Sequence, residues 1–106
     1  MDLVTAIYAL TGTFPRQEEY RLTSQLARAI VSVPANIAEG QRRSSRKDYS
    51  HFVGIAHGSL AEVETLLLIA ERIRIATGDQ IKPLLKHADE ISRMLYAMRK
   101  KLSTPK

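Results

Sequence analysis

Carboxylates and histidines are the side chains of this sequence that could bind a metal ion or transfer protons, so their spacing comes first. A di-metal centre in a helical bundle needs a Glu-x-x-His pair on each of two helices, together with further carboxylates. No glutamate here has a histidine three residues after it, and His51, His57 and His87 are scattered. The sequence also has no cysteine and no glycine-rich phosphate loop. We therefore expect no catalytic residues, no metal, no cofactor and no enzymatic activity.

A second candidate for chemistry is a run of cations that could contact phosphates. Its members are Arg42, Arg43, Arg46 and Lys47. We expect such contacts to follow the backbone of RNA or DNA without reading its sequence, because base stacking needs several aromatic side chains in one groove and the aromatic residues here are dispersed. The alternative is a solvated loop before a well-capped helix, since Ser45 with Asp48 three residues later resembles a capping box.

Four polar residues form a third candidate cluster, with Asn36 and Glu39 on one predicted helix and Ser59 and Glu62 on the next. The members of each pair are three residues apart, so they lie on one face of their helix. We favour a structural role over a catalytic one: the four side chains pair in the interior and fix the register of the two helices. The alternative for Glu62 is that it faces water.

The elements that must position these residues are helices. Apolar residues from Leu22 to Ile37 recur at steps of three and four, which predicts a helix over about 15–39 with a bend or a break near Pro34. Similar stripes predict helices over 3–10, 46–75 and 79–102, of which the third helix in chain order, 46–75, is the longest. Thr77-Gly78-Asp79 should end this third helix and cap the next one. The predicted fold is all-α, an up-down-up-down antiparallel four-helix bundle in which residues 1–106 form a single domain.

Small residues mark where two of these helices should approach each other. They gather at 35–40 on one helix and at 54–61 on the next, so we expect these regions to pack together. Glycine inside a helix costs about 0.5–1 kcal/mol relative to alanine, so Gly54 and Gly58 indicate close backbone contact.

Composition sets the broad class of the protein. The chain has 106 residues, 44% of them hydrophobic, which suits one domain with one core. A net charge of +5 and a pI near 9.8 favour a polyanionic partner. The first ten residues have no basic leader, and no apolar run nears the roughly 20 residues that span a bilayer. We therefore expect a cytoplasmic protein that makes no membrane contact.

The stretch from Ile7 to Leu67 resembles the bacterial four-helix-bundle family of ribosomal-RNA intervening-sequence proteins. The matching features are Phe14-Pro15 with Glu18, Leu22-Thr23 with Gln25, Ser32 to Gly40, and Ala56 to Leu60 with Glu62. The resemblance implies a homo-oligomer, a pentamer, with a link to RNA or DNA. The family is similar in fold to the accessory variability determinant proteins of diversity-generating retroelements, which are basic, pentameric and nucleic-acid-binding. No catalytic residues carry over.

Two hypotheses about function follow from the sequence. The first is a non-enzymatic homo-oligomer that binds RNA or DNA through the cations of residues 42–47, with avidity from several copies. The alternative is a protein-interaction scaffold whose basic surface binds an acidic protein partner. A large native mass fits both hypotheses, so only binding measurements separate them.

Overall fold

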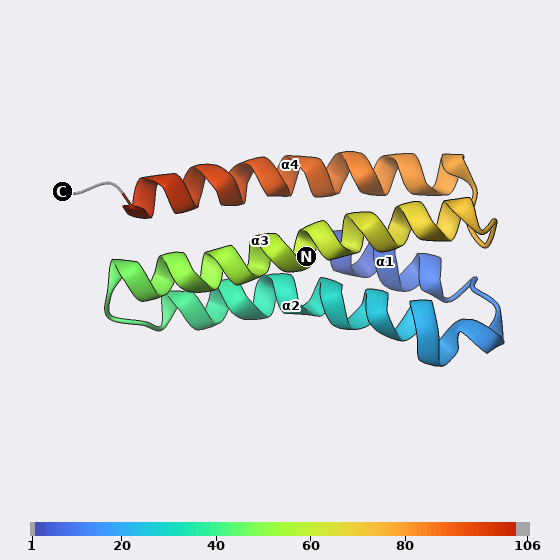
Figure 1. The fold of residues 1–106 in the computed structure, drawn as a ribbon, viewed down its shortest axis with the longest axis horizontal. Coiled ribbons are helices and arrows are strands. Elements are labelled where there is room, and N and C mark those ends of the chain that lie inside the picture. Colours follow the sequence, from blue (N-terminus) through green and yellow to red (C-terminus); the bar gives the residue numbers. More distant parts are fainter. Residues whose placement is uncertain (1, 104–106) are drawn as a thin grey trace.

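The helices of the computed structural model begin and end close to where the sequence predicts them (Figure 1). The structure describes residues 2–103, apart from the side chains of Glu19 and Tyr20. Helix α1 spans Asp2–Thr11, α2 spans Ser24–Gln41, α3 spans Arg46–Arg72 and α4 spans Gly78–Ser103. These bounds confirm the predicted all-α fold of four helices, in which α3 is the longest.

The chain enters α2 less regularly than the sequence predicts. A 3-10 turn at Arg16–Glu18 and a π-helical stretch at Glu19–Thr23 precede α2, where the apolar pattern predicts one helix from about residue 15. Thr23 makes no side-chain capping bond at the start of α2. Phe14 and Leu22 are both buried in this segment. Their burial outweighs regular α-helical hydrogen bonding here.

Helix α2 continues through Pro34 without a break. Proline cannot donate the hydrogen bond that would reach the carbonyl four residues earlier, which is why the sequence allows for an interruption. Packing on both sides of Pro34 holds the helix together: Val33 is fully buried before it, and Gly40 is buried against α3 after it.

The connection between α3 and α4 combines a Schellman motif with a capping box. The N–H of Ile75 donates to the carbonyl of Ala70 at 3.0 Å, which closes the last turn of α3. Arg74 supplies the left-handed residue of this motif, with φ 67°. The N–H of Gln80 then donates to Oγ1 of Thr77 at 3.2 Å, and the N–H of Thr77 donates to Oε1 of Gln80 at 2.9 Å. The predicted turn and cap near Thr77 are therefore confirmed.

The four helices form an elongated antiparallel bundle, 49 × 23 × 19 Å along its principal axes. Helix α3 lies between α2 and α4, and the short α1 lies behind them, over only the half of the bundle near the α3–α4 connection (Figure 1). The core is formed by apolar side chains of all four helices, and its largest fully buried members are Leu3, Ile7, Leu26, Ile30, Leu60, Leu67 and Ile81. The predicted up-down-up-down order is confirmed.

The first small-residue region contacts α3 at Gly40, but its neighbours there lie before the predicted region 54–61. A Cβ atom at Gly40 would lie 2.9 Å from Cδ1 of Tyr49 and 3.0 Å from Cβ of Phe52. A Cβ atom at Gly58 would meet no described atom within 4 Å, so the close backbone contact predicted there is wrong. At Gly54 the neighbouring group is the side chain of Arg99 on α4 and not a helix backbone.

Among the described residues, α3 is the one helix that is long and apolar enough to cross a membrane, judged by length and composition alone. The core helix of a soluble protein passes the same test. Helices α2 and α4 pack along α3 and bury part of its apolar surface, while Ile55, Leu68 and Ile69 stay exposed.

Candidate nucleic-acid interface

The four cations predicted from the sequence all lie at the end of the rod where α2 turns into α3. Arg42 and Arg43 are in the connecting loop, and Arg46 and Lys47 begin α3; all four are exposed. Oγ of Ser45 accepts a hydrogen bond from the N–H of Asp48 at 3.0 Å, so the predicted helix cap is confirmed. The loop and the cap together leave the four basic residues exposed.

Two of these cations lie in the first turn of α3, where the helix dipole disfavours positive charge. A helix N-terminus carries partial positive charge, so acidic side chains are favoured there and basic ones cost about 0.3–1 kcal/mol each. Arg46 and Lys47 occupy the first turn of α3, with Asp48 as its one carboxylate. The unpaired N–H groups of the helix and the two cations add to one positive field, which favours an anion at this end.

Two of the four cations already make contacts within the chain. Nη2 of Arg43 lies 2.6 Å from Oε1 of Glu39, and its guanidinium lies 4.8 Å from the centre of the Phe52 ring. Nη2 of Arg46 donates to the carbonyl of Lys101, in the last turn of α4, at 2.7 Å. Arg42 and Lys47 have no side-chain partner among the residues that the structure describes. They are the cations most available to an external phosphate.

The last turns of α4 add cations that the sequence analysis did not connect with the loop. Arg99, Lys100 and Lys101 lie at the same end of the rod as residues 42–47, because α4 runs antiparallel to α3 (Figure 1). A basic helix C-terminus is favourable by itself, which is how the sequence alone explained it. The predicted up-down order of the helices could have shown that the cations of residues 42–47 and those of residues 99–101 lie at the same end.

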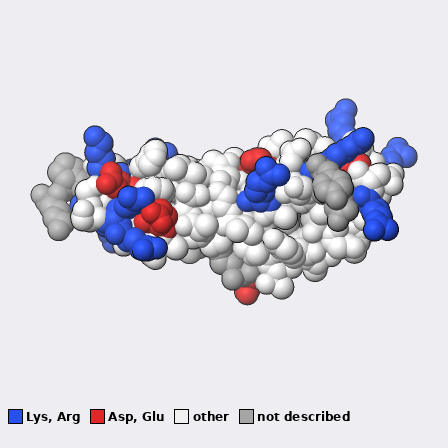
Figure 2. Space-filling model, turned by 90° about the horizontal axis from the view of Figure 1, so that it is seen from below, with Lys and Arg blue, Asp and Glu red and all other residues white. Residues whose placement is uncertain are grey.

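Together these residues form what we call the basic end. It comprises Arg42, Arg43, Arg46, Lys47, Arg99, Lys100 and Lys101, with Glu39 and Asp48 as its acidic neighbours. The whole sequence has 16 basic and 11 acidic residues, so the remaining residues balance at nine of each sign. Figure 2 shows Lys and Arg toward both ends of the rod. Only the basic end has a large excess, and it accounts for the whole net charge of +5.

The predicted polar cluster between the second and third helices forms only in part. Nδ2 of Asn36 donates to both the carbonyl and Oγ of Ser32 at 2.8 Å, and Oγ of Ser32 lies 2.9 Å from Oγ of Ser59 on α3. Glu39 lies outside the cluster and pairs with Arg43. Ser32, which the sequence analysis left out, replaces the two glutamates because its short side chain fits where the helices are close.

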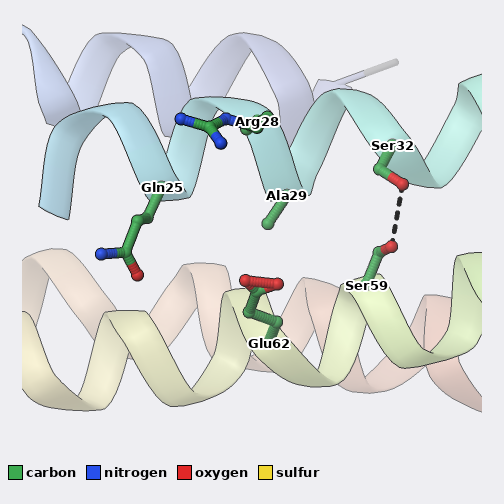
Figure 3. A pocket seen from close by; sticks show the side chains of 6 residues that line it. All are labelled: Gln25, Arg28, Ala29, Ser32, Ser59 and Glu62. Atoms are coloured by element: carbon green, nitrogen blue, oxygen red, sulfur yellow. Dashed lines mark hydrogen bonds between the residues drawn. The ribbon is translucent and has the colours of Figure 1, made fainter. Parts of the chain in front are cut away.

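Glu62 lies in a shallow pocket of about 220 Å³ beside this cluster. The pocket is lined by Gln25, Arg28, Ala29 and Ser32 from α2 and by Ser59 and Glu62 from α3 (Figure 3). The carboxylate of Glu62 points toward α2, but its residue is exposed and forms no ion pair with a described residue. Arg28 instead donates from Nη2 to Oγ of Ser24 at 3.2 Å. No nucleophile and base converge in this pocket.

The histidines and the remaining carboxylates do not gather into a metal site within the described part of the chain. Nε2 of His57 and Oγ of Ser92 form a hydrogen bond of 2.8 Å between α3 and α4. Burial, and secondly the charge of Asp89, raise the pKa of Glu64, while His57 acts in the opposite direction. These groups link two helices and show no convergent catalytic arrangement.

Comparison with known proteins places the chain in a family. The family model described as 23S rRNA-intervening sequence protein matches residues 1–97. A crystal structure of a protein of unknown function from the S23 ribosomal protein family of Bacteroides thetaiotaomicron VPI-5482 is similar, with 26% identity and a TM-score of 0.80. The similarity covers 92% of this chain and 88% of that one. A search of curated proteins found no match. This chain therefore belongs to the family of 23S rRNA-intervening sequence proteins.

Proposed function

We propose that this protein is a non-enzymatic, homo-oligomeric bundle that binds the backbone of RNA or DNA, without sequence specificity, through its basic end. The observation that carries the proposal is that this end holds the entire net charge of the chain. The description of the family connects it with 23S rRNA, which agrees with a nucleic-acid partner. The proposal places the protein in the cytoplasm and assigns it no cofactor.

Binding would be driven by the release of counterions from the nucleic acid. Each phosphate neutralised by a cation releases condensed ions, which makes the affinity fall steeply with salt. Arg42 and Lys47 can meet phosphates without giving up a side-chain contact with any residue that the structure describes. Arg43 and Arg46 would have to share their present partners, Glu39 and the carbonyl of Lys101.

Assembly of several copies would bring several basic ends together, so that a nucleic acid could bind more than one of them at once. Three large apolar side chains of α3 are exposed, Ile55, Leu68 and Ile69, and Ile73 directly after the helix is exposed as well. Clustered apolar surface of this kind is typical of a contact with another protein. We infer that copies of the chain associate through α3, and the family resemblance supports a pentamer. Sedimentation should then give a mass several times 11.9 kDa.

The decisive test is binding of a labelled blunt RNA duplex and its DNA counterpart across a salt series. The test variant carries Arg42→Gln and Lys47→Gln, which remove two cations that have no side-chain partner among the described residues. The control carries Arg16→Gln and Arg21→Gln, the same change of charge at the opposite end of the rod. The slope of log affinity against log salt should fall by about 0.9 for each lost phosphate contact, so by about 1.8 in the test variant.

The control should keep the slope of the intact protein. Equal slopes for the two variants would mean that the basic end is not where the backbone binds. Failure of the intact protein to bind at low salt would contradict the proposal and favour the scaffold hypothesis, in which the basic end receives an acidic protein.

A further inference from the structure

A groove of about 390 Å³ runs between α3 and α4 beside the basic end. Its lining consists of Ser50 and His57 from α3 and Tyr96, Arg99, Lys100 and Ser103 from α4. The volume falls within the range of about 300–1,000 Å³ that is usual for small-molecule sites. None of the described residues that line the groove is acidic. The groove is therefore suited to an anionic group.

Arg99 fits into this groove because Gly54 on α3 has no side chain. Its guanidinium lies against Gly54, where a Cβ atom would be only 2.9 Å from Cζ. Arg99 makes no hydrogen bond or ion pair with any residue that the structure describes. A guanidinium offers five N–H donors in a planar fork that matches phosphate oxygens. The groove thus presents a positioned phosphate-binding group with its donors unused.

Tyr96 supplies the aromatic element that the sequence analysis did not find near the basic run. Its residue is 62% exposed, and its ring borders the same groove as Arg99. An exposed aromatic ring can stack on a nucleic-acid base, and such stacking tolerates any base. Among the described residues that line the groove, Tyr96 is the one tyrosine, phenylalanine or tryptophan, so the groove provides a place for one base and not for a continuous strand.

The remaining lining groups match the sugar between a base and its phosphate. The hydroxyl of Ser50 can donate to or accept from ribose oxygens, and that of Ser103, which donates to the carbonyl of Lys100 at 2.8 Å, can accept from a ribose hydroxyl. His57 is held in place by its hydrogen bond to Ser92. The groove combines a cation for phosphate, hydroxyls for the sugar and a ring for the base.

We propose that this groove binds a single unpaired, phosphate-bearing nucleotide at the end of an RNA or DNA duplex. The proposal rests on the proposed function, because the basic end must hold the backbone of the adjoining duplex. An unpaired nucleotide is required because the bases inside a duplex already stack on each other and cannot present a face to Tyr96.

The test compares a blunt duplex with the same duplex carrying a one-nucleotide overhang, at 5′ and at 3′ ends. The intact protein should bind one overhang form at least about five-fold tighter than the blunt form, the lower end of what stacking one base contributes. Tyr96→Ala should abolish this preference and leave blunt-duplex affinity unchanged. Tyr8→Ala is the matched control, because Tyr8 is a 50% exposed tyrosine on α1 that does not line the groove.

A second variant tests the groove proposal with a substitution that should not destabilise the fold. Gly54→Ala places a methyl group where the guanidinium of Arg99 lies, so Arg99 must move, which a flexible side-chain end does at little cost. Alanine is also the better helix former, so this variant should melt at a higher temperature than the intact protein. It should nevertheless lose the preference for the overhang.

Two results would overturn the groove proposal while leaving backbone binding intact. One is salt-dependent binding of the blunt duplex with no preference for an overhang. The other is an overhang preference that survives both Tyr96→Ala and Gly54→Ala. Failure to bind the blunt duplex and both overhang forms, even at low salt, would overturn the groove proposal and the proposed function together.

Discussion

The contact between α2 and α3 at Gly40 predicts a large difference between two apparently equivalent substitutions. Gly40→Ala would place a methyl group 2.9 Å from Cδ1 of Tyr49, 3.0 Å from Cβ of Phe52 and 3.3 Å from the carbonyl oxygen of Tyr49. The last two atoms cannot move without the helix itself. Overpacking of this kind costs about 1–3 kcal/mol, against a gain in helix propensity of at most about 1 kcal/mol. We expect a net loss of up to about 2 kcal/mol once the full propensity gain is subtracted.

Gly58→Ala is the matched control within α3. No described atom lies within 4 Å of the added methyl group, so only the propensity gain of about 0.8–1.0 kcal/mol applies. For a domain of this size, 1 kcal/mol shifts the melting temperature by about 4–8 °C. Thermal unfolding followed by circular dichroism, at one fixed protein concentration, should therefore show Gly40→Ala melting below the intact protein and Gly58→Ala above it.

A Gly40→Ala variant as stable as the intact protein would refute this account of how α2 and α3 pack. Loss of stability in Gly58→Ala would instead indicate that another group lies against Gly58. If that loss grew with protein concentration, a second copy of the chain would lie against Gly58, since only association makes the melting temperature depend on concentration.

Three further predictions concern the connections and one half-buried carboxylate, Glu64. Ser45→Ala removes the cap of α3 and should lower the free energy of unfolding by about 1 kcal/mol, measured by urea denaturation. Arg74→Gly should be more stable than Arg74→Ala by about 1 kcal/mol in the same assay, reversing the usual order, because φ at this position is 67°. Burial and Asp89 raise the pKa of Glu64 above its unfolded value. The stability that Glu64 contributes is thus present at acid pH and lost as pH rises through its folded pKa. Glutamine does not titrate, so the stability of Glu64→Gln relative to the intact protein should increase over the same rise in pH. An unchanged difference between acid and neutral pH would contradict this account of Glu64.

The features that the sequence predicted well depend on neighbours along the chain. The helix stripes, the Ser45 cap and the turn near Thr77 each involve residues within a few positions of one another. The irregular entry before Ser24 was not predicted, and the choice between a bend and a break at Pro34 was left open, because both depend on what packs against those segments.

The predicted site was incomplete for a related reason. Whether Glu62 or Ser32 faces the partner helix depends on how each helix is rotated about its axis, which periodicity determines only to within a broad face. Gly40 and Gly58 are indistinguishable as sequence features, yet only Gly40 meets a neighbour. Arg99 and Tyr96 are more than fifty residues from the loop cations, and only the antiparallel path of α4 brings them to the same end.

The hydrogen bond from Arg46 to Lys101 makes the end of α4 sensitive to whatever else Arg46 binds. The last carbonyls of a helix have no hydrogen-bond donor within the helix. Arg46 donates to one of them, that of Lys101, at 2.7 Å. A phosphate that competes for this guanidinium returns the carbonyl to water and loosens the final turn. Occupancy of the basic end and fraying of α4 are then thermodynamically linked. Backbone amides near Lys101 should therefore exchange their hydrogens faster when nucleic acid is bound, the reverse of the protection that a bound partner usually confers.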